Sequence, residues 1–238
     1  MLLQFKIALQ SNSLEEASAQ VKKMSMCRDF EPDFLTLASH EAVASNQAIV
    51  AVAALCSLLA LECTDQASKV KEAIIIRNII TLLSEKMGKG AEDILPYYQQ
   101  AKECLDVSTV AAFCGDGIPG EQEGLWFAAS ALDHGLQLGK DGKWQLSSDF
   151  LVVAAAFYNA LPGSPENLQS EKLALILASS SLLDNGEVDS NTLKLANKSL
   201  ERCKTVSCSF HQYASFALWF GRGSFPLGGP SFPHACAE

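Results

Sequence analysis

The sequence predicts an all-α fold built from repeated pairs of antiparallel helices. Apolar residues recur at helical spacing through most of the chain, and turn-forming residues separate the helical stretches. Small residues also return at the same offsets in successive stretches. The chain has 238 residues, of which 48% are hydrophobic and 19% charged, and this composition suits a well-buried core.

The central unit, Ala128 to Leu161, carries the pattern most clearly. Small or apolar residues follow one another there in steps of three, four, two, three, four and three: Gly135, Leu138, Gly142, Trp144, Ser147, Leu151 and Ala154. This is the spacing of a tetratricopeptide repeat, in which a small residue lets two helices approach and a glycine opens the turn. Such a unit cannot bury its apolar face alone, so the sequence predicts a solenoid of stacked units.

Two earlier units repeat these offsets, at residues 1–26 and 29–61. Asn12 and Asn46 are the predicted turns between their helices. Asn12 and Ser13 are expected to cap the second helix of the first unit. Pro32 is expected in the first turn of the next unit, where a missing amide is tolerated.

The middle of the chain is less regular. Helices are predicted at residues 67–86 and 91–105, and Pro96 marks either a kink or the true start of the second. Residues 107–123 are predicted to form an irregular loop, or a short helix followed by a loop, because they contain the glycine-rich run CGDGIPGEQEG.

A last helix pair is predicted at residues 170–184 and 190–203, with its turn at Asn185-Gly186. The helical-repeat domain therefore covers residues 1–203. Residues 204–238 lose the repeat phase and contain scattered glycine and proline. We interpret this irregular tail as a product of truncation or mis-splicing of a protein that continues as further repeats.

Charge and composition argue against two classes of partner. The net charge of −9 offers no basic surface for a nucleic acid backbone, so no direct nucleic acid binding is expected. The longest apolar run, residues 49–61, would form a helix of roughly 20 Å, too short for a bilayer core of about 30 Å. Four of the eight cysteines lie inside or beside helical patterns, where free cysteine behaves as a small buried hydrophobe: Cys27, Cys56, Cys63 and Cys104. None of the eight forms a Cys-x-x-Cys pair, and this usage favours a reducing compartment.

The run from Gly115 to Gly120 matches the G-x-G-x-x-G pattern of dinucleotide-binding proteins. That motif functions between a strand and a helix. Val110 to Phe113 are compatible with a short strand, but no other strand pattern exists to build a sheet. We interpret the run as a loop between repeats, and a dinucleotide-binding enzyme remains a remote alternative.

Possible metal ligands occur near the carboxyl end at Cys203, Cys208 and His211, with His234 or Cys236 as a distant fourth. The spacing between the cysteines is not a common zinc spacing. His40 and His134 lack a nucleophile motif, and Glu41, which follows His40, points elsewhere on a helix. We therefore predict no metal, no cofactor and no catalytic residue.

A protein-binding groove is the more promising site. In stacked repeats the first helix of each pair lines the concave face, where peptides or partner helices bind. His40 and His134, on such helices, are interpreted as surface or groove residues. The repeat phase predicts six groove residues: Thr36, His40, Val43, Leu132, Leu136 and Lys140. The alternative is that these six are solvated helix positions that bind no ligand.

Three blocks of the chain resemble consecutive blocks of a known family: residues 29–59, residues 77–85 and residues 125–161. The most specific parts are FLTL at Phe34–Leu37 and WF at Trp126–Phe127. The family is the meiotic tetratricopeptide proteins, the Zip-four group of plants and fungi with testis-expressed protein eleven in mammals. The resemblance covers Leu14 to Cys203, and because the family's members are longer, it implies a partial chain.

This resemblance implies a non-enzymatic scaffold in the nucleus, on meiotic chromosomes. It would promote crossover formation and homologue synapsis by holding recombination and chromosome-axis proteins together. One departure is Leu132, where the family pattern has a tryptophan, so a partner contact made through that ring would be lost. The alternative is a generic tetratricopeptide adaptor or co-chaperone, which needs a basic cluster in the groove, and only Lys140 is a candidate.

Self-association of this chain is the first testable expectation. The end of a solenoid that lacks its next unit exposes apolar surface, so we expect oligomers or aggregates. Size-exclusion chromatography with light scattering over a dilution series measures this. A monodisperse monomer at every concentration would contradict the expectation.

Overall fold

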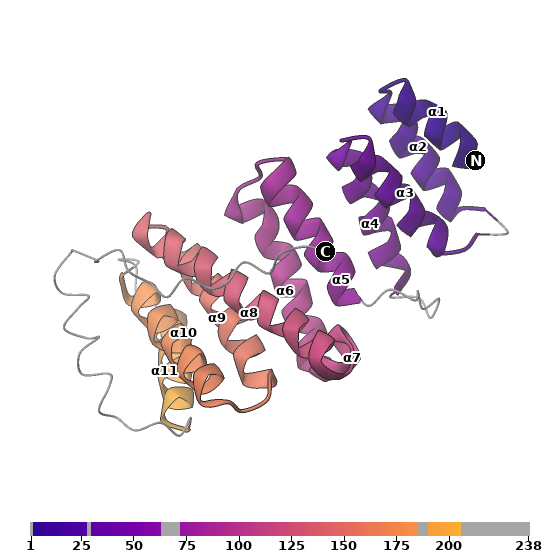
Figure 1. Ribbon diagram of the computed structural model, residues 1–238. Coiled ribbons are helices and arrows are strands. Elements are labelled where there is room, and N and C mark those ends of the chain that lie inside the picture. The colour runs from indigo at the N-terminus through magenta and orange to yellow at the C-terminus, as the bar shows by residue number, and fades with distance from the viewer. Residues whose placement is uncertain (1, 28–29, 63–71, 185–189, 206–238) are drawn as a thin grey trace. The chain divides into compact units, whose positions relative to one another are not determined.

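The computed structural model describes residues 2–27, 30–62, 72–184 and 190–205. All regular structure in these ranges is helical, which confirms the all-α prediction (Figure 1). The tail after residue 205 lies outside the described residues, as do Cys208, His211, His234, Cys236 and the turn at Asn185-Gly186.

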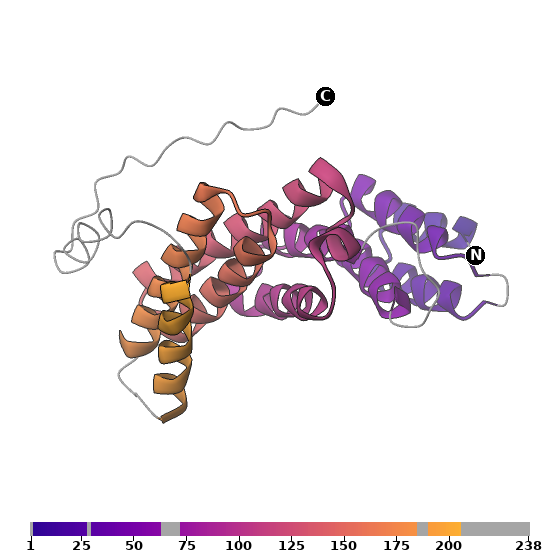
Figure 2. The ribbon, with the colours of Figure 1, turned by 90° about the horizontal axis from the view of Figure 1, so that it is seen from below.

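The helices pack as pairs of neighbours in the sequence, and the two views agree on this order (Figures 1 and 2). The strongest packing joins α8 to α9, α9 to α10 and α10 to α11. The helices are α1 (Leu2–Gln10), α2 (Leu14–Ser25), α3 (Asp33–Ala44), α4 (Ala48–Glu62), α5 (Glu72–Thr81) with a π-helical turn η1 (Leu82–Lys86), α6 (Ala91–Val107), α7 (Val110–Cys114), α8 (Gly117–Lys140), α9 (Trp144–Ala160), α10 (Pro165–Asp184) and α11 (Ser190–Thr205).

The turns within three of the pairs share one backbone conformation. Asn12 and Asn46 have φ of 56° and Gly142 has φ of 73°, and each lies two residues before the second helix of its pair. This left-handed conformation is unfavourable for most residues but accessible to asparagine and glycine. The predicted turn positions are therefore confirmed, and the side-chain chemistry explains them.

The same backbone hydrogen bond closes all three turns. In each, the residue before the second helix donates its amide to the carbonyl five residues earlier, as at the end of a helix with a left-handed cap. The pairs are Ser13 to Ala8 (3.0 Å), Gln47 to Ala42 (2.8 Å) and Lys143 to Leu138 (2.9 Å).

The first two pairs are also joined through their turns. The side-chain amide of Gln47 donates to the Leu9 carbonyl at 2.9 Å and lies 3.2 Å from Oδ1 of Asn12. The predicted cap on α2 is only partly right, because Ser13 occupies the cap position but its side chain makes no capping hydrogen bond.

Proline does not mark the start of α6. The helix begins at Ala91 and Pro96 lies inside it, so the alternative of a true start at Pro96 is wrong. The helix predicted at 67–86 is present from Glu72, and residues 67–71 lie outside the described ranges.

The irregular loop predicted at residues 107–123 is mostly helical, and this part of the domain prediction is wrong. Thr109 caps α7 by accepting the Ala112 amide at 3.2 Å. α8 then begins at Gly117, and Pro119 lies in its first turn, where no intrahelical amide bond is lost. A side chain at Gly120 would place its Cβ 1.7 Å from the Gly115 carbonyl oxygen. These glycines therefore permit a close contact between a turn and a helix.

α8 and α9 meet at Gly135, as the repeat spacing predicts. A Cβ at this position would lie 2.6 Å from Cγ of Leu151 and 3.2 Å from the Ser147 carbonyl oxygen. The Ser147 hydroxyl donates to the Gly135 carbonyl at 2.8 Å, and Ser181 Oγ on α10 lies 3.1 Å from Ser147 Oγ. The absence of a side chain at Gly135 therefore allows the close approach of α8 and α9 at this point.

An aromatic cluster joins α6 to this pair. The ring of Tyr98 makes edge contacts with Phe127 (6.2 Å between centroids) and Phe150 (5.3 Å). Its hydroxyl is 2.6 Å from Ser130 Oγ, and burial raises the pKa of Tyr98 to about 12. The hydrogen bond satisfies the hydroxyl of this buried ring.

The last pair begins earlier than expected. α10 begins at Pro165 and not at residue 170, because Ser164 accepts the Asn167 amide at 3.1 Å and Pro165 suits the first helical position. α11 runs to Thr205, two residues beyond the predicted end of the repeat domain.

Replacement of Gly135 by valine tests the α8–α9 contact. Gly135→Val places methyl groups against Leu151, so we expect the free energy of unfolding to fall by about 2 kcal/mol. Urea denaturation followed by circular dichroism measures it. Gly163→Val is the control, because a Cβ at Gly163 meets nothing within 4 Å. Equal effects of the two substitutions would contradict the assigned role.

Candidate functional site

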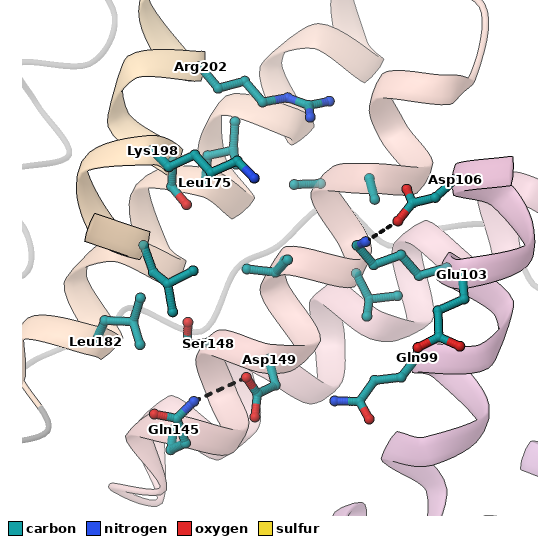
Figure 3. A pocket seen from close by; sticks show the side chains of 17 residues that line it. Gln99, Glu103, Asp106, Gln145, Ser148, Asp149, Leu175, Leu182, Lys198 and Arg202 are labelled. Atoms are coloured by element: carbon teal, nitrogen blue, oxygen red, sulfur yellow. Dashed lines mark hydrogen bonds and ion pairs between the residues drawn. The ribbon is translucent and has the colours of Figure 1, made fainter. Parts of the chain in front are cut away.

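A groove of about 630 Å³ opens among α6, α9, α10 and α11 (Figure 3). α6 and α11 each contribute a stripe at positions i, i+3, i+4 and i+7, starting at Gln99 and Leu195. Residues in this spacing share one face of a helix. We call this feature the charged groove, since its two walls carry charges of opposite sign.

The wall from α6 is mainly acidic. Glu103 and Asp106 line it, and in Figure 3 both come from the helix opposite α11. Asp106 is held by an ion pair with Lys102, one turn earlier. Glu103 is exposed and forms no ion pair with the residues that the structure describes. The opposite face of α6 buries Ile94 and Tyr98, which fixes this wall against the core.

Asp149 of α9 is a third acidic group in the groove. Burial raises the pKa of its carboxyl group, and a hydrogen bond from Gln145 Nε2 (3.1 Å to Oδ1) partly offsets the effect. The ionised carboxylate therefore costs folding free energy at neutral pH. No cation among the described residues pairs with it.

The wall from α11 is basic. Lys198 and Arg202 lie one turn apart on α11, and the side chains of both line the groove (Figure 3). Arg202 Nε donates to Oε1 of Glu171 at 2.9 Å, and Glu171 is only 1% exposed on α10. This buried carboxylate fixes the position of Arg202. Lys198 is exposed and has no ion-pair partner in the described part of the chain.

The floor between the walls is apolar. Leu175 and Leu182 of α10 are buried beneath it. Val152 of α9 and Leu195 of α11 line the groove with exposed fractions of 36% and 54%. An apolar floor between charged walls can bind a molecule that has an apolar face and charged edges.

The structure places none of the six predicted groove residues in the charged groove. Thr36 is half-buried on α3, and His40 and Val43 are exposed on the same helix. Lys140 is exposed in the last turn of α8. The charged groove is instead built largely on α6, α9 and α11, the second helices of their pairs.

Leu132 and Leu136 have a structural role. Both pack against an apolar cluster of Leu151, Leu177 and Ala178, contributed by α9 and α10. Their side chains are half-buried in this contact. Leu132 therefore belongs to the packing between helices.

The prediction of His134 as a surface or groove residue is only partly right, because its ring packs into the aromatic cluster. Its ring is half-buried between Tyr98 (5.9 Å between centroids) and Phe150 (5.2 Å). Burial lowers the pKa of its imidazole, and the neighbouring Asp133 opposes this shift. A neutral imidazole is the form that suits an aromatic cluster.

The dinucleotide and metal alternatives gain no support from geometry. The segment before Gly115, compatible in sequence with a strand, is the helix α7. Within the described ranges there is no group of three or more metal-binding side chains. Cys203 is half-buried, and the other residues considered with it as ligands lie outside those ranges. No described helix has both the length and the apolar character to cross a bilayer.

The spacing of basic residues near the carboxyl end of the helical region indicates one wall of the groove, and the repeat phase does not. Lys198 and Arg202 are four residues apart, as basic residues on one helix face should be. Which helix faces them could not be read from spacing, because α6 and α11 are separated by nearly a hundred residues.

No protein-family model and no solved structure matches the chain.

Replacement of Asp149 by asparagine tests whether burial of the ionised carboxylate lowers the stability of the fold. The folded state raises the pKa of this carboxyl above its usual 3.8, so stability is lost as pH rises through the folded-state pKa. We expect Asp149→Asn to raise the melting temperature at pH 7, by an amount that vanishes towards pH 3. Asp141→Asn is the control, since Asp141 accepts the same bond from Gln137 (3.1 Å) but is exposed. A rise at Asp141 as large as that at Asp149 would contradict the role of burial.

Proposed function

We propose that this protein is a non-enzymatic scaffold that binds other proteins, with the charged groove as a binding surface. The observation that carries the proposal is the combination of an exposed apolar floor, at Val152 and Leu195, with walls of opposite charge. Protein surfaces offer apolar and charged groups of both signs side by side, whereas a small anion or cation would be repelled by one wall.

The architecture we propose is a tetratricopeptide-like solenoid of antiparallel helix pairs. The equivalent turn residues Asn12 and Asn46 stand 34 positions apart, which is the length of one tetratricopeptide repeat. Gly142 repeats their backbone conformation and hydrogen bond in a third pair. Repeated pairs of this kind serve in many proteins as binding platforms.

The proposed process is meiotic recombination, on the basis of the sequence resemblance. The chain would act in the nucleus, on chromosomes, and hold recombination or axis proteins during crossover formation and synapsis. The Trp126-Phe127 block that carries part of the resemblance belongs to the aromatic cluster of the fold. It therefore supports a shared architecture more directly than a shared partner contact.

The generic adaptor or co-chaperone is the less favoured alternative. Recognition of an acidic peptide tail would need basic residues on both sides of a groove. The charged groove has Glu103 and Asp149 on the side opposite Lys198, so an acidic tail would meet repulsion there.

Antibody staining of spread chromosomes from the source organism tests the meiotic role. We expect discrete foci along paired chromosomes in meiotic cells and none in dividing somatic nuclei, because crossover scaffolds act where homologues pair. Cells that lack the gene provide the staining control. A diffuse cytoplasmic signal in every tissue would remove the meiotic role and favour the generic adaptor.

A further inference from the structure

We propose that the charged groove binds one amphipathic α-helix of a partner protein, with basic residues along one edge of its apolar stripe and acidic residues along the other. The inference rests on the proposed function in one respect, that the ligand is a protein. It adds the conformation of the bound segment and the signs of its two charged edges.

The dimensions of the groove fit a short helix. The lining stripes of α6 and α11 run from Gln99 to Asp106 and from Leu195 to Arg202, and each is about 10 Å long along its helix axis. The lining face of α9 extends from Gln145 to Ala156, about 16 Å. A bound helix of two to three turns, at about 5.4 Å per turn, would cover this length.

The floor supplies the apolar contact that such a helix needs. Val152 and Leu195 are large apolar side chains left exposed on two different helices, and both line the same groove. An apolar stripe at i, i+3, i+4 and i+7 on the bound helix would cover both residues. Covering them removes apolar surface from water, which favours association.

The acidic wall selects a basic edge on the ligand. Glu103 has no ion-pair partner among the described residues, and the Asp149 carboxylate is partly buried without a cation. Lysine or arginine on the bound helix would supply the missing countercharge. The contact with Asp149 would be screened less by salt than one made at an exposed carboxylate.

The basic wall selects an acidic edge. Arg202 is held in place by the buried Glu171, and Lys198 stands one turn before it without an ion-pair partner in the ranges described. Glutamate or aspartate along the second edge would complete this side. Because the walls have opposite signs, a helix with two edges of one sign would be repelled by one of them, so the arrangement provides specificity.

Selection from a phage-displayed helix library tests the inference on the full chain. The library presents helices of about 18 residues with a fixed leucine and alanine stripe, long enough to be helical in part before binding. The positions on both edges vary among lysine, glutamate and glutamine. We expect the selected helices to carry lysine on one edge and glutamate on the other.

The matched variants are Lys198→Glu and Lys194→Glu. Both residues are exposed on α11, but only Lys198 lines the groove. We expect Lys198→Glu to weaken binding of the selected helices about tenfold and to remove the preference for glutamate in a new selection. Lys194→Glu should leave both unchanged, and thermal melts check that the variants remain folded.

Three outcomes would overturn the inference: no enrichment, enriched helices without opposite edge charges, or a selection that Lys198→Glu does not alter. These outcomes are independent of the chromosome staining. Meiotic foci without helix selection would reject the inference and leave the proposed process in place. Helix selection with diffuse cytoplasmic staining would support the inference and reject the meiotic role.

Discussion

The contact between α8 and α9 at Gly135 is the constraint on which the described fold depends most. Leu151 and the Ser147 carbonyl approach this position so closely that a side chain there would collide with them. The hydrogen bond from Ser147 to the Gly135 carbonyl fixes the register of the two helices. Because α9 also packs against α6 and α10, its position against α8 sets the arrangement of the groove floor.

α9 has one face that packs against neighbouring helices and another that lines the groove. One face carries Ser147 and Leu151 and packs against its neighbours, whereas the groove face carries Asp149 and Val152. The partly buried carboxylate reduces the stability of the chain, and the exposed valine contributes less than a buried one would. Such features are typical of binding surfaces, where the missing contacts come from a partner.

The region before α8 shows why glycine and proline alone do not predict a loop. Pro119 and Gly120 lie within the first turn of α8, where proline loses no hydrogen bond and glycine allows the Gly115 carbonyl to approach. Loops and the first turns of helices are both rich in glycine and proline. In this region the packing of α7 against α8 identifies the segment as the start of a helix.

The sequence by itself determined the helical class, the turns at Asn12, Asn46 and Gly142, and the small residue at Gly135. Each of these is a local requirement, of helical period or of backbone conformation, that one segment expresses alone. The tertiary structure decided that His134 joins the aromatic cluster, that Leu132 packs between helices, and that Glu103 and Lys198 line the same groove. Those placements depend on how helices distant in the sequence pack together, and helical spacing within one segment does not specify that packing.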